Sequence, residues 1–340
     1  MVGVAVIGAG YWGPNLVRNV QATPELRLTA LCDLDVERAR NVLGRYSTVR
    51  ATSSLDEVLA DPEVEAVAVA TPAATHLRVA LAALEAGKHV LVEKPLASSY
   101  ADGLKLVTAA EERGLTLMLD HTFCYTPVVR RLRELVRGGE LGDIQYIDSV
   151  RINLGLVQPD IDVLWDLAPH DLSILDSILP EGVHPVAVAA HGSDPAGVGR
   201  ACVAYMSVQL SNGSIAHAHV NWLSPTKIRT MIVGGSDKTA VWNDLDPTQP
   251  LAVYDRGIER DDESVRVSYR IGDMVAPALP GGEALRGVMA EFAAAIIEKR
   301  APLTDGRSGL RVLAQLEAAS ASLAAGGTFV PLTDVNGGAL

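Results

Sequence analysis

The sequence predicts an α/β protein with two domains: a doubly wound parallel sheet, then an α+β domain with a largely antiparallel or mixed open sheet. Three observations support this prediction. Short apolar runs alternate with amphipathic stretches over the first 120 of the 340 residues. A glycine-rich turn follows the first apolar run, and beyond Arg137 the apolar runs become short and strand-like. We therefore expect one domain over residues 1–120 and a second over residues 121–340, each long enough to bury its own core.

The apolar run Val2–Ile7 is typical of a strand buried on both faces of a parallel sheet. Ser54 is the expected N-cap of a short helix. The other strands expected in this domain lie at residues 26–31, 66–70, 89–92 and 116–119. The helices expected between them lie at residues 15–20, 36–45, 54–59, 76–86 and 99–113. This βαβ alternation predicts a doubly wound sheet.

The second domain is expected to be richer in antiparallel strands. Asn212 and Gly213 separate two strand-like segments and indicate a hairpin. One helix is expected at residues 169–179, because Pro169 is tolerated only in a first turn. The expected strands are residues 144–152, 201–210, 214–222, 227–233 and 240–242, and two helices close the chain at residues 283–299 and 308–325.

The chain is acidic, with 29 Lys and Arg against 41 Asp and Glu and a formal net charge of −12. An acidic protein repels phosphate backbones and anionic lipid headgroups, so we expect neither nucleic acid nor a membrane as partner. Residues 1–120 hold 11 basic and 15 acidic side chains, so two thirds of the net charge falls after them. Neutral and cationic small molecules remain as ligands.

The cysteines, Cys32, Cys124 and Cys202, are few, odd in number and far apart, which indicates buried thiols in a reducing compartment. No signal or transit peptide is expected, and no apolar run approaches the roughly 18 residues of a membrane helix. A cytoplasmic protein is therefore expected. His217 and His219 share one strand face, but core packing is favoured over a metal site, and no metal is predicted.

The glycine-rich turn Gly8-Ala-Gly10-Tyr-Trp-Gly13 follows a buried strand and opens a helix, as in the dinucleotide-binding Rossmann fold. Gly8 allows the tight turn, Gly10 admits a pyrophosphate, and Gly13 permits close packing of helix and strand. Asp33, at the end of the next strand, can accept hydrogen bonds from ribose hydroxyls and would repel a 2′-phosphate, so NAD is favoured over NADP. Arg38 can in principle receive that phosphate, although a solvated helix arginine is the favoured interpretation.

Two more loops follow strands and are expected to reach the ligand crevice. Thr71-Pro72 leads to His76, and Glu93-Lys94-Pro95 ends the next strand. Lys94 can donate to a substrate hydroxyl and stabilise a developing alkoxide, or be an ordinary surface lysine. The predicted cofactor contacts are Gly8, Gly10, Tyr11, Trp12, Gly13, Asp33, Arg38, Thr71, Pro72, His76, Glu93 and Lys94.

Asp166 and His170 stand four residues apart, so they share a face if the segment is helical. An imidazole with a carboxylate one turn away suits general-base chemistry. The alternative is a helix cap with a packed histidine.

Together the fingerprint, Asp33, the Thr71 loop, Glu93-Lys94-Pro95 and the Asp166–His170 pair resemble the Gfo/Idh/MocA oxidoreductase family, over essentially the whole chain. The resemblance implies a Rossmann NAD-binding domain, a second domain that binds substrate and whose sheet builds homodimers or homotetramers, and catalysis by Lys94, His170 and Asp166. Residues 10–15, 165–171 and 221–225 resemble the branch of nucleotide-sugar 3-dehydrogenases that act on UDP-N-acetylglucosamine and uronates.

One departure from that branch bears on the substrate, because Asp162 stands where the branch tends to carry Asn. With Asp160 and Asp166 it would place three acids near the substrate, which suits an amino sugar better than a diphosphate. The predicted substrate contacts are Tyr125, Asn153, Asp160, Asp162 and Trp165.

The expected function is NAD-dependent oxidation of a secondary ring hydroxyl, at C3, of an amino sugar or aminoglycoside-type substrate in a biosynthetic pathway. The alternatives are a nucleotide-sugar 3-dehydrogenase of the UDP-N-acetylglucosamine or uronate type and an inositol 2-dehydrogenase. A non-enzymatic NAD-binding sensor is the rival from another class, and intact Lys94, Asp166 and His170 count against it.

Overall fold

The computed structural model describes residues 1–158, 161–260 and 267–332. The chain forms two compact units, Met1–Thr126 with Gly282–Leu313, and Pro127–Gly281 with Ala314–Leu340. The sequence assigned everything after residue 120 to the second domain. The structure differs, because a late segment that includes a whole helix packs with the first unit.

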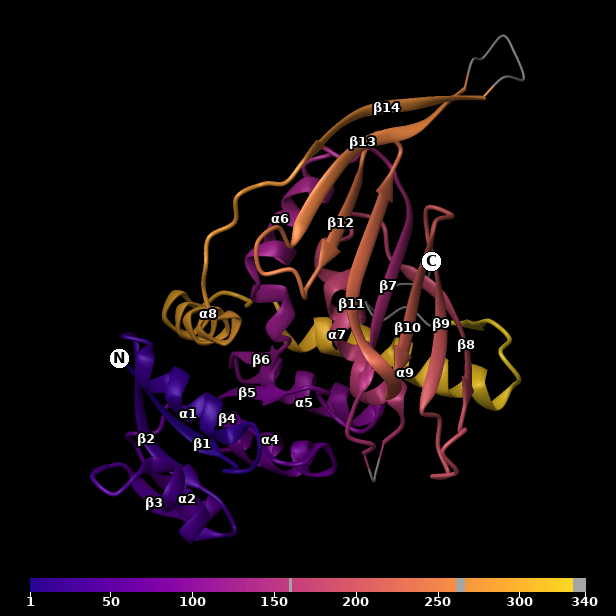
Figure 1. Ribbon diagram of the computed structural model, residues 1–340. Helices are drawn as coiled ribbons and strands as arrows, with labels where there is room; N and C mark the ends of the chain where they lie inside the picture. The colour runs from indigo at the N-terminus through magenta and orange to yellow at the C-terminus, as the bar shows by residue number, and fades with distance from the viewer. Residues whose placement is uncertain (159–160, 261–266, 333–340) are drawn as a thin grey trace. The chain divides into compact units, whose positions relative to one another are not determined.

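The first unit contains a parallel sheet of six strands in the order β3-β2-β1-β4-β5-β6 (Figure 1). This is the order of a dinucleotide-binding sheet, and it brings the carboxyl ends of all the strands to one edge. The strands are β1 (Val2–Ile7), β2 (Leu26–Cys32), β3 (Arg50–Thr52), β4 (Ala66–Val69), β5 (His89–Glu93) and β6 (Leu117–Asp120).

Helices connect these strands by crossovers, which are right-handed in nearly all parallel sheets. The predicted N-cap Ser54 is confirmed, since its side chain accepts a hydrogen bond from the Glu57 N–H. The elements are α1 (Gly13–Ala22), α2 (Val36–Leu43), α3 (Leu55–Ala60), η1 (Ala73–Thr75), α4 (His76–Glu85), α5 (Tyr100–Glu112) and η2 (Thr122–Tyr125).

Helix α8 (Ala284–Glu298) completes the core of the first unit. Its Val288, Met289 and Phe292 are fully buried in the same cluster as the strands and α1. Glu283, just before the helix, accepts hydrogen bonds from Arg18 of α1 at 2.6 and 2.7 Å. A late segment thus closes a core that begins at residue 2, because apolar burial does not depend on chain order.

The second unit contains a sheet of nine strands in the order β14-β13-β12-β11-β7-β10-β9-β8-β15. Its neighbouring strands are antiparallel except for β7 and β10, which are parallel. The predicted hairpin at Asn212-Gly213 joins β9 to β10. The strands are β7 (Ile144–Leu154), β8 (Pro185–Ser193), β9 (Val203–Leu210), β10 (Ile215–Asn221), β11 (Leu223–Gly235), β12 (Thr239–Asn243), β13 (Leu251–Arg260), β14 (Val267–Val275) and β15 (Val330–Pro331).

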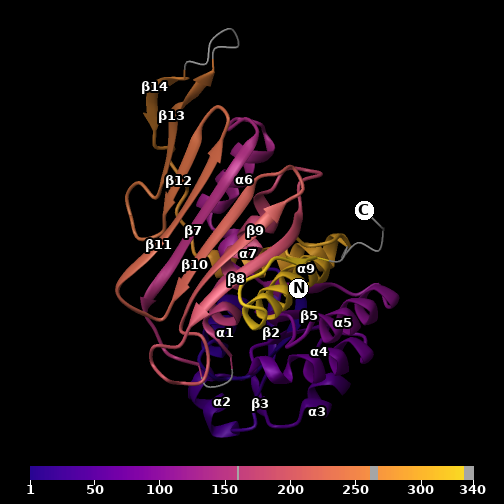
Figure 2. The ribbon, with the colours of Figure 1, turned by 90° about the vertical axis from the view of Figure 1, so that its right-hand side faces the viewer.

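Helices cover one face of this sheet, and Figure 2 views it from the other face. They are α6 (Pro127–Arg137), α7 (Val163–Ile178) and the later part of α9 (Gly306–Ala324). The predicted start of α7 at Pro169 was wrong, because the helix begins at Val163 and holds Pro169 inside it. In the part of the chain that the structure describes, no helix combines the length and apolarity needed to cross a membrane.

Replacing Phe292 by Ala tests the place of α8 in the first core. We expect it to lower the free energy of unfolding by about 3–5 kcal/mol, because it empties a fully buried site. Ile297→Ala on the same helix, at a side chain that is 56% exposed, should change it by less than about 0.5 kcal/mol. Urea unfolding followed by circular dichroism measures both, and equal effects would contradict this role of α8.

Candidate active site

The glycine-rich loop connects β1 to α1 and is shaped to receive a phosphate group. Gly8 has φ +105°, and a Cβ there would lie 2.6 Å from the Ala70 carbonyl oxygen. A Cβ on Gly13 would lie 2.2 Å from the Gly8 oxygen, whereas a Cβ on Gly10 would meet nothing within 4 Å. No side chain caps the first turn of α1, where Pro14 has no N–H and the Asn15 N–H bonds the Trp12 oxygen at 3.0 Å. An anion would therefore be held by the positive end of the helix dipole and by N–H groups of the loop before it. These residues therefore fit the pyrophosphate of NAD.

Asp33 is held in place at the end of β2. Its Oδ2 accepts the Ala9 N–H at 2.7 Å and its Oδ1 accepts the Asp35 N–H at 2.8 Å. Arg38 lies 3.8 Å from the Asp33 Oδ1 and 3.5 Å from the Asp35 Oδ2, with 54% of its side chain exposed. The carboxylates of Asp33 and Asp35 thus lie beside the Arg38 guanidinium, which is the group that would have to bind the 2′-phosphate of NADP. This arrangement agrees with the expectation of NAD.

The two aromatic residues of the loop differ in their surroundings. Tyr11 is exposed, and its ring stacks beside Trp12 at a centroid distance of 6.5 Å. The Trp12 Nε1 donates to the Asp120 Oδ2 at 3.0 Å, which ties the loop to the end of β6. Trp12 therefore positions the loop, and whether either ring touches the cofactor stays a prediction.

His76 lies behind the loops rather than at their surface. It is 1% exposed, with Nδ1 2.8 Å from the Pro95 oxygen and Nε2 2.8 Å from the Thr71 oxygen. Burial lowers the pKa of this imidazole. The ring links the Thr71-Pro72 loop to the cis Lys94-Pro95 peptide, so its observed role is to hold the two loops together.

Glu93, Asp120 and His121 lie at the carboxyl ends of β5 and β6, beside Lys94. Burial, and after it the Asp120 carboxylate, raises the pKa of Glu93 well above its usual value. Burial, and after it the charge of Lys94, lowers the pKa of His121 to about 3. Burial thus favours the uncharged form of the Glu93 carboxyl and of the His121 imidazole beside Lys94.

The second unit presents Asp166 and His170 one turn apart on α7, as their spacing predicted. The Trp222 Nε1 donates to the Asp166 Oδ2 at 3.0 Å. Trp222 is buried between β10 and β11, so the carboxylate is oriented by a rigid neighbour. The sequence indicated Trp222 only through its place in residues 221–225, and not as a partner of Asp166.

Asp162, one of the three acids predicted to lie near the substrate, is the N-cap of α7. The Asp162 side chain accepts the Trp165 N–H at 3.0 Å and caps α7, while burial raises the pKa of this carboxyl. The indole of Trp165 donates to the Ser320 Oγ at 2.9 Å. Asp160 lies outside the described residues. Asp162 therefore serves the start of the helix that carries Asp166.

A buried ion pair that sequence reasoning missed fixes α7 against the sheet. Arg151 of β7 donates to both carboxylate oxygens of Asp171 at 2.9 and 3.0 Å, and the Ser149 hydroxyl donates to the same carboxylate at 2.8 Å. Asp171 directly follows His170 in the chain. The available signal was the alternation of β7, which places Ser149 and Arg151 on the face toward the helices. Asn153, a predicted substrate contact, follows on the same strand face.

Tyr125 requires a correction. It was predicted to contact the substrate, but it is 4% exposed in the core of the first unit, where its hydroxyl lies 2.9 Å from the Thr304 Oγ1. Burial raises the pKa of its phenol. The aromatic ring fills the core, and this explains its presence after β6 without a ligand.

His217 and His219 point to the open face of the sheet, where Tyr205 stacks on His219 at a centroid distance of 4.3 Å. Ring stacking accounts for this pair, but the predicted core packing was wrong, because the rings lie on the open face beside Tyr205.

Comparison with known proteins assigns the chain. A model described as an oxidoreductase family with an NAD-binding Rossmann fold matches residues 2–121, and one described as a GFO/IDH/MocA C-terminal domain matches residues 129–241. The UDP-N-acetylglucosamine 3-dehydrogenase of Acidithiobacillus ferrooxidans is 32% identical over 319 residues, 91% of this chain and 93% of that protein. The chain belongs to the Gfo/Idh/MocA oxidoreductase family. This Gfo/Idh/MocA protein is therefore an NAD-dependent oxidoreductase, and the predicted family, fold class and cofactor are confirmed.

Solved structures agree with this assignment. UDP-N-acetylglucosamine 3-dehydrogenase GnnA from Acidithiobacillus ferrooxidans superposes with a TM-score of 0.80 at 30% identity, covering 96% of this chain and 99% of that one. GenD2 from gentamicin A biosynthesis, in complex with NAD, superposes with a TM-score of 0.82 at 26% identity, covering 98% and 97%. The fold of this chain is thus similar to the folds of these two proteins over nearly its whole length.

Asp33→Ala should shift the cofactor preference. We expect NAD affinity to fall about tenfold, or about 1.4 kcal/mol, because a ribose acceptor is lost, while NADP affinity falls less. Asp35→Asn removes a neighbouring charge yet can still cap α2, and it should leave the preference unchanged. Fluorescence titration with NADH and NADPH measures both ratios, and an equal loss for the two cofactors would contradict the assignment.

Glu93→Gln tests the neutral state of this buried acid. A folded-state pKa raised above the usual 4.5 means that wild-type stability falls as the pH rises from about 4.5 toward the raised value. Glutamine does not ionise, so the free energy of unfolding of the variant should rise relative to that of the wild type through that pH range. Urea unfolding at successive pH values measures the difference, with Glu85→Gln as an exposed control. A difference that does not widen with pH would show that Glu93 is ionised.

Arg151→Met should lower the free energy of unfolding by about 3–5 kcal/mol, because it leaves the Asp171 carboxylate buried and unpaired. Arg151→Met combined with Asp171→Leu should be less destabilised than the sum of the single variants. Urea unfolding of the wild type, the two single variants and the double variant gives the four free energies of this double-mutant cycle. Strict additivity would mean that the pair does not hold α7.

Proposed function

We propose that this protein oxidises a secondary ring hydroxyl, at C3, of an amino sugar of the aminoglycoside type in a biosynthetic pathway. The observation that carries the proposal is the Asp166–His170 pair on one face of α7, with Asp166 held by the Trp222 indole. Lys94, at the end of β5, supplies the third group. The relative named for 3-dehydrogenation of UDP-N-acetylglucosamine and GenD2 of gentamicin A biosynthesis support a reaction at a sugar ring.

Each residue has a distinct part in the proposed reaction. His170 takes the proton of the hydroxyl, because an imidazole accepts protons near neutral pH. Lys94 donates to the same oxygen and stabilises its developing negative charge. Asp166 orients the sugar or the imidazole. The glycine-rich loop and Asp33 would hold NAD, which would supply the acceptor for the carbinol hydrogen as hydride, and the residues named above would position the sugar against it.

The identity of the sugar has two candidates. The excess of acidic residues after residue 120 favours a cationic amino sugar, because their summed negative charge attracts it. Asp162 caps a helix, so Asp166 is the described acid that is assigned to contact the sugar. The 32% identity across nearly the full length of the A. ferrooxidans enzyme favours the second candidate, a UDP-N-acetylglucosamine-type nucleotide sugar. The two substrates carry opposite charges, which makes them separable by experiment.

The test is formation of NADH, followed by absorbance, with a panel of aminoglycosides, amino sugars, UDP-N-acetylglucosamine, UDP-uronates and inositols. His170→Ala should abolish turnover of the accepted sugar and leave NADH binding unchanged, because the imidazole is assigned to proton transfer alone. Unchanged turnover in this variant would overturn the assignment of the base. A silent panel with intact NADH binding would instead favour the sensor.

Ionic strength separates the two sugars. The apparent affinity for a cationic amino sugar should weaken as salt is added, because screening removes its attraction to an acidic protein. The apparent affinity for an anionic nucleotide sugar should hold or improve.

We further propose a homodimer or homotetramer that assembles through the open face of the nine-stranded sheet. Large apolar side chains are exposed on β13 and β14, namely Ile258, Tyr269, Ile271 and Met274. Such exposed apolar groups support burial against a second copy.

The described cysteines are free and buried, which supports a cytoplasmic location.

A further inference from the structure

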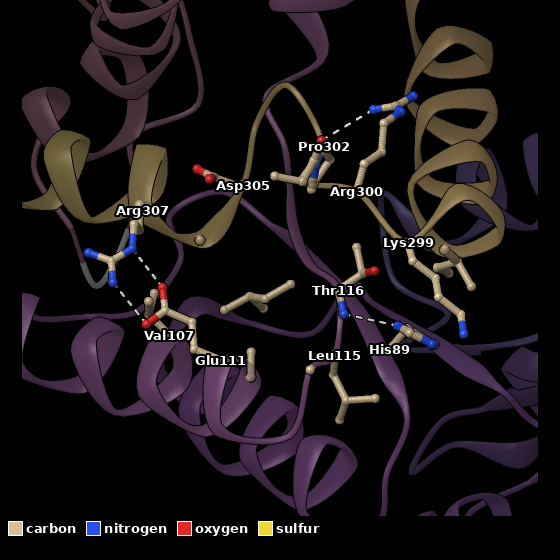
Figure 3. A pocket seen from close by; sticks show the side chains of 16 residues that line it. His89, Val107, Glu111, Leu115, Thr116, Lys299, Arg300, Pro302, Asp305 and Arg307 are labelled. Carbon is tan, nitrogen blue, oxygen red and sulfur yellow. Dashed lines mark hydrogen bonds and ion pairs between the residues drawn. The ribbon is translucent and has the colours of Figure 1, made fainter.

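An open cavity of about 460 Å³ lies in the first unit, and none of the residues assigned to the reaction is among those that line it. It is lined by the start of β5 and β6, the ends of α5 and α8, and the start of α9 (Figure 3). We call it the amino-edge cavity, because parallel strands start at one edge of a sheet and the cofactor motifs follow their other ends. The two ends of β5 are about 13 Å apart at a strand's rise per residue. The volume lies in the range of small-molecule sites.

Lys299 marks this cavity by its backbone. It ends α8 with φ 54° and ψ 46°, and it is the one non-glycine residue with positive φ among those that the structure describes. The next N–H, from Arg300, bonds the Ala295 oxygen at 3.1 Å and closes the helix in the usual way. Other helices of this chain end at or just before a glycine with positive φ: Gly44, Gly87, Gly114, Gly139 and Gly326. Glycine would close α8 without strain, so the lysine side chain must have another use.

The charge of Lys299 is also distinct from that of its neighbours. The Arg300 guanidinium binds both Glu291 oxygens at 2.7 and 2.9 Å, and the Arg307 guanidinium binds both Glu111 oxygens at 2.6 and 2.9 Å. Lys299 has no carboxylate partner within the described ranges 1–158, 161–260 and 267–332. Lys299 lies at the carbonyl end of α8, where the helix dipole favours a positive charge without forming a hydrogen bond to the ammonium. The ammonium is thus available to an anion.

His89 adds a directed donor to the same cavity. Its Nδ1 accepts the Thr116 N–H at 2.9 Å, and burial lowers its pKa. The ring is therefore neutral with its proton on Nε2, which leaves this N–H to donate. In Figure 3 the side chains of His89 and Lys299 extend to the same side of the view. Leu115, Ile296 and other apolar side chains also line the cavity.

We propose that the amino-edge cavity binds a small organic anion, separately from the cofactor and the sugar. Lys299 and the His89 N–H hold a phosphate or carboxylate headgroup. A compact apolar body packs against Leu115 and Ile296. The site stands independently of the proposed sugar reaction, since no residue of that reaction lines it.

Calorimetric titration of the full-length protein tests the proposal. The protein is first saturated with NAD, so that the probes cannot enter the pyrophosphate site. The probes are phenyl phosphate and benzoate, with benzyl alcohol as the neutral analogue of similar size. We expect at least one anion to bind and the alcohol not to bind, and the tighter anion assigns the headgroup. Absence of binding by both anions, or equal binding of the alcohol, would overturn the proposal.

Variants locate the bound probe. Lys299→Gly should weaken the anion about fivefold or more without lowering the melting temperature, because glycine suits the left-handed backbone. His89→Asn keeps an acceptor for the Thr116 N–H but removes the Nε2 donor, and it should also weaken binding. Lys227→Ala removes an exposed charge from the second unit and should have no effect. Equal weakening by Lys227→Ala, or no effect of the other two variants, would overturn the site.

Discussion

The parallel direction of the six strands in the first unit constrains everything else in that unit. Each strand delivers its following loop to the same edge, where helix N-termini and unpaired strand ends offer backbone donors. The glycine-rich loop, Asp33, the Thr71 loop and Lys94 all follow strands of this sheet. A change in the direction of one strand would carry its loop to the opposite edge. The cofactor chemistry is therefore a consequence of strand direction before it depends on any single side chain.

The proposed catalytic residues are supported by polar groups that do not themselves react. His76 joins two loops in the first unit, and Trp12 joins the glycine-rich loop to Asp120. In the second unit the Trp222 indole holds Asp166. Buried hydrogen bonds of this kind hold a site in one geometry, which matters more for catalysis than their contribution to stability. The Arg151–Asp171 pair does the same for a whole helix.

Much of the fold was predictable because local rules govern it. The buried strand β1, the turn after it, the Ser54 cap and the Asn212-Gly213 hairpin follow from the nearby sequence. The start of α7 was missed because Asp162 supplies a cap that outweighs the presence of Pro169 later in the helix. Tyr125 and α8 were misassigned for another reason. Their partners in the core are far away in the chain, and no local pattern shows which core an apolar side chain will join.

The sequence by itself determined the NAD-binding motif and the Asp166–His170 spacing, because each depends on residues within one turn or one strand-to-helix connection. The order of such motifs along the whole chain determined the family. Only the tertiary structure decided which residues support these motifs: Trp222 donates to Asp166, and Arg151 pairs with Asp171. It also decided that Lys299 lines a cavity with His89. These pairings join residues that are distant in the chain, so they are settled by the packing of whole elements and not by local propensity.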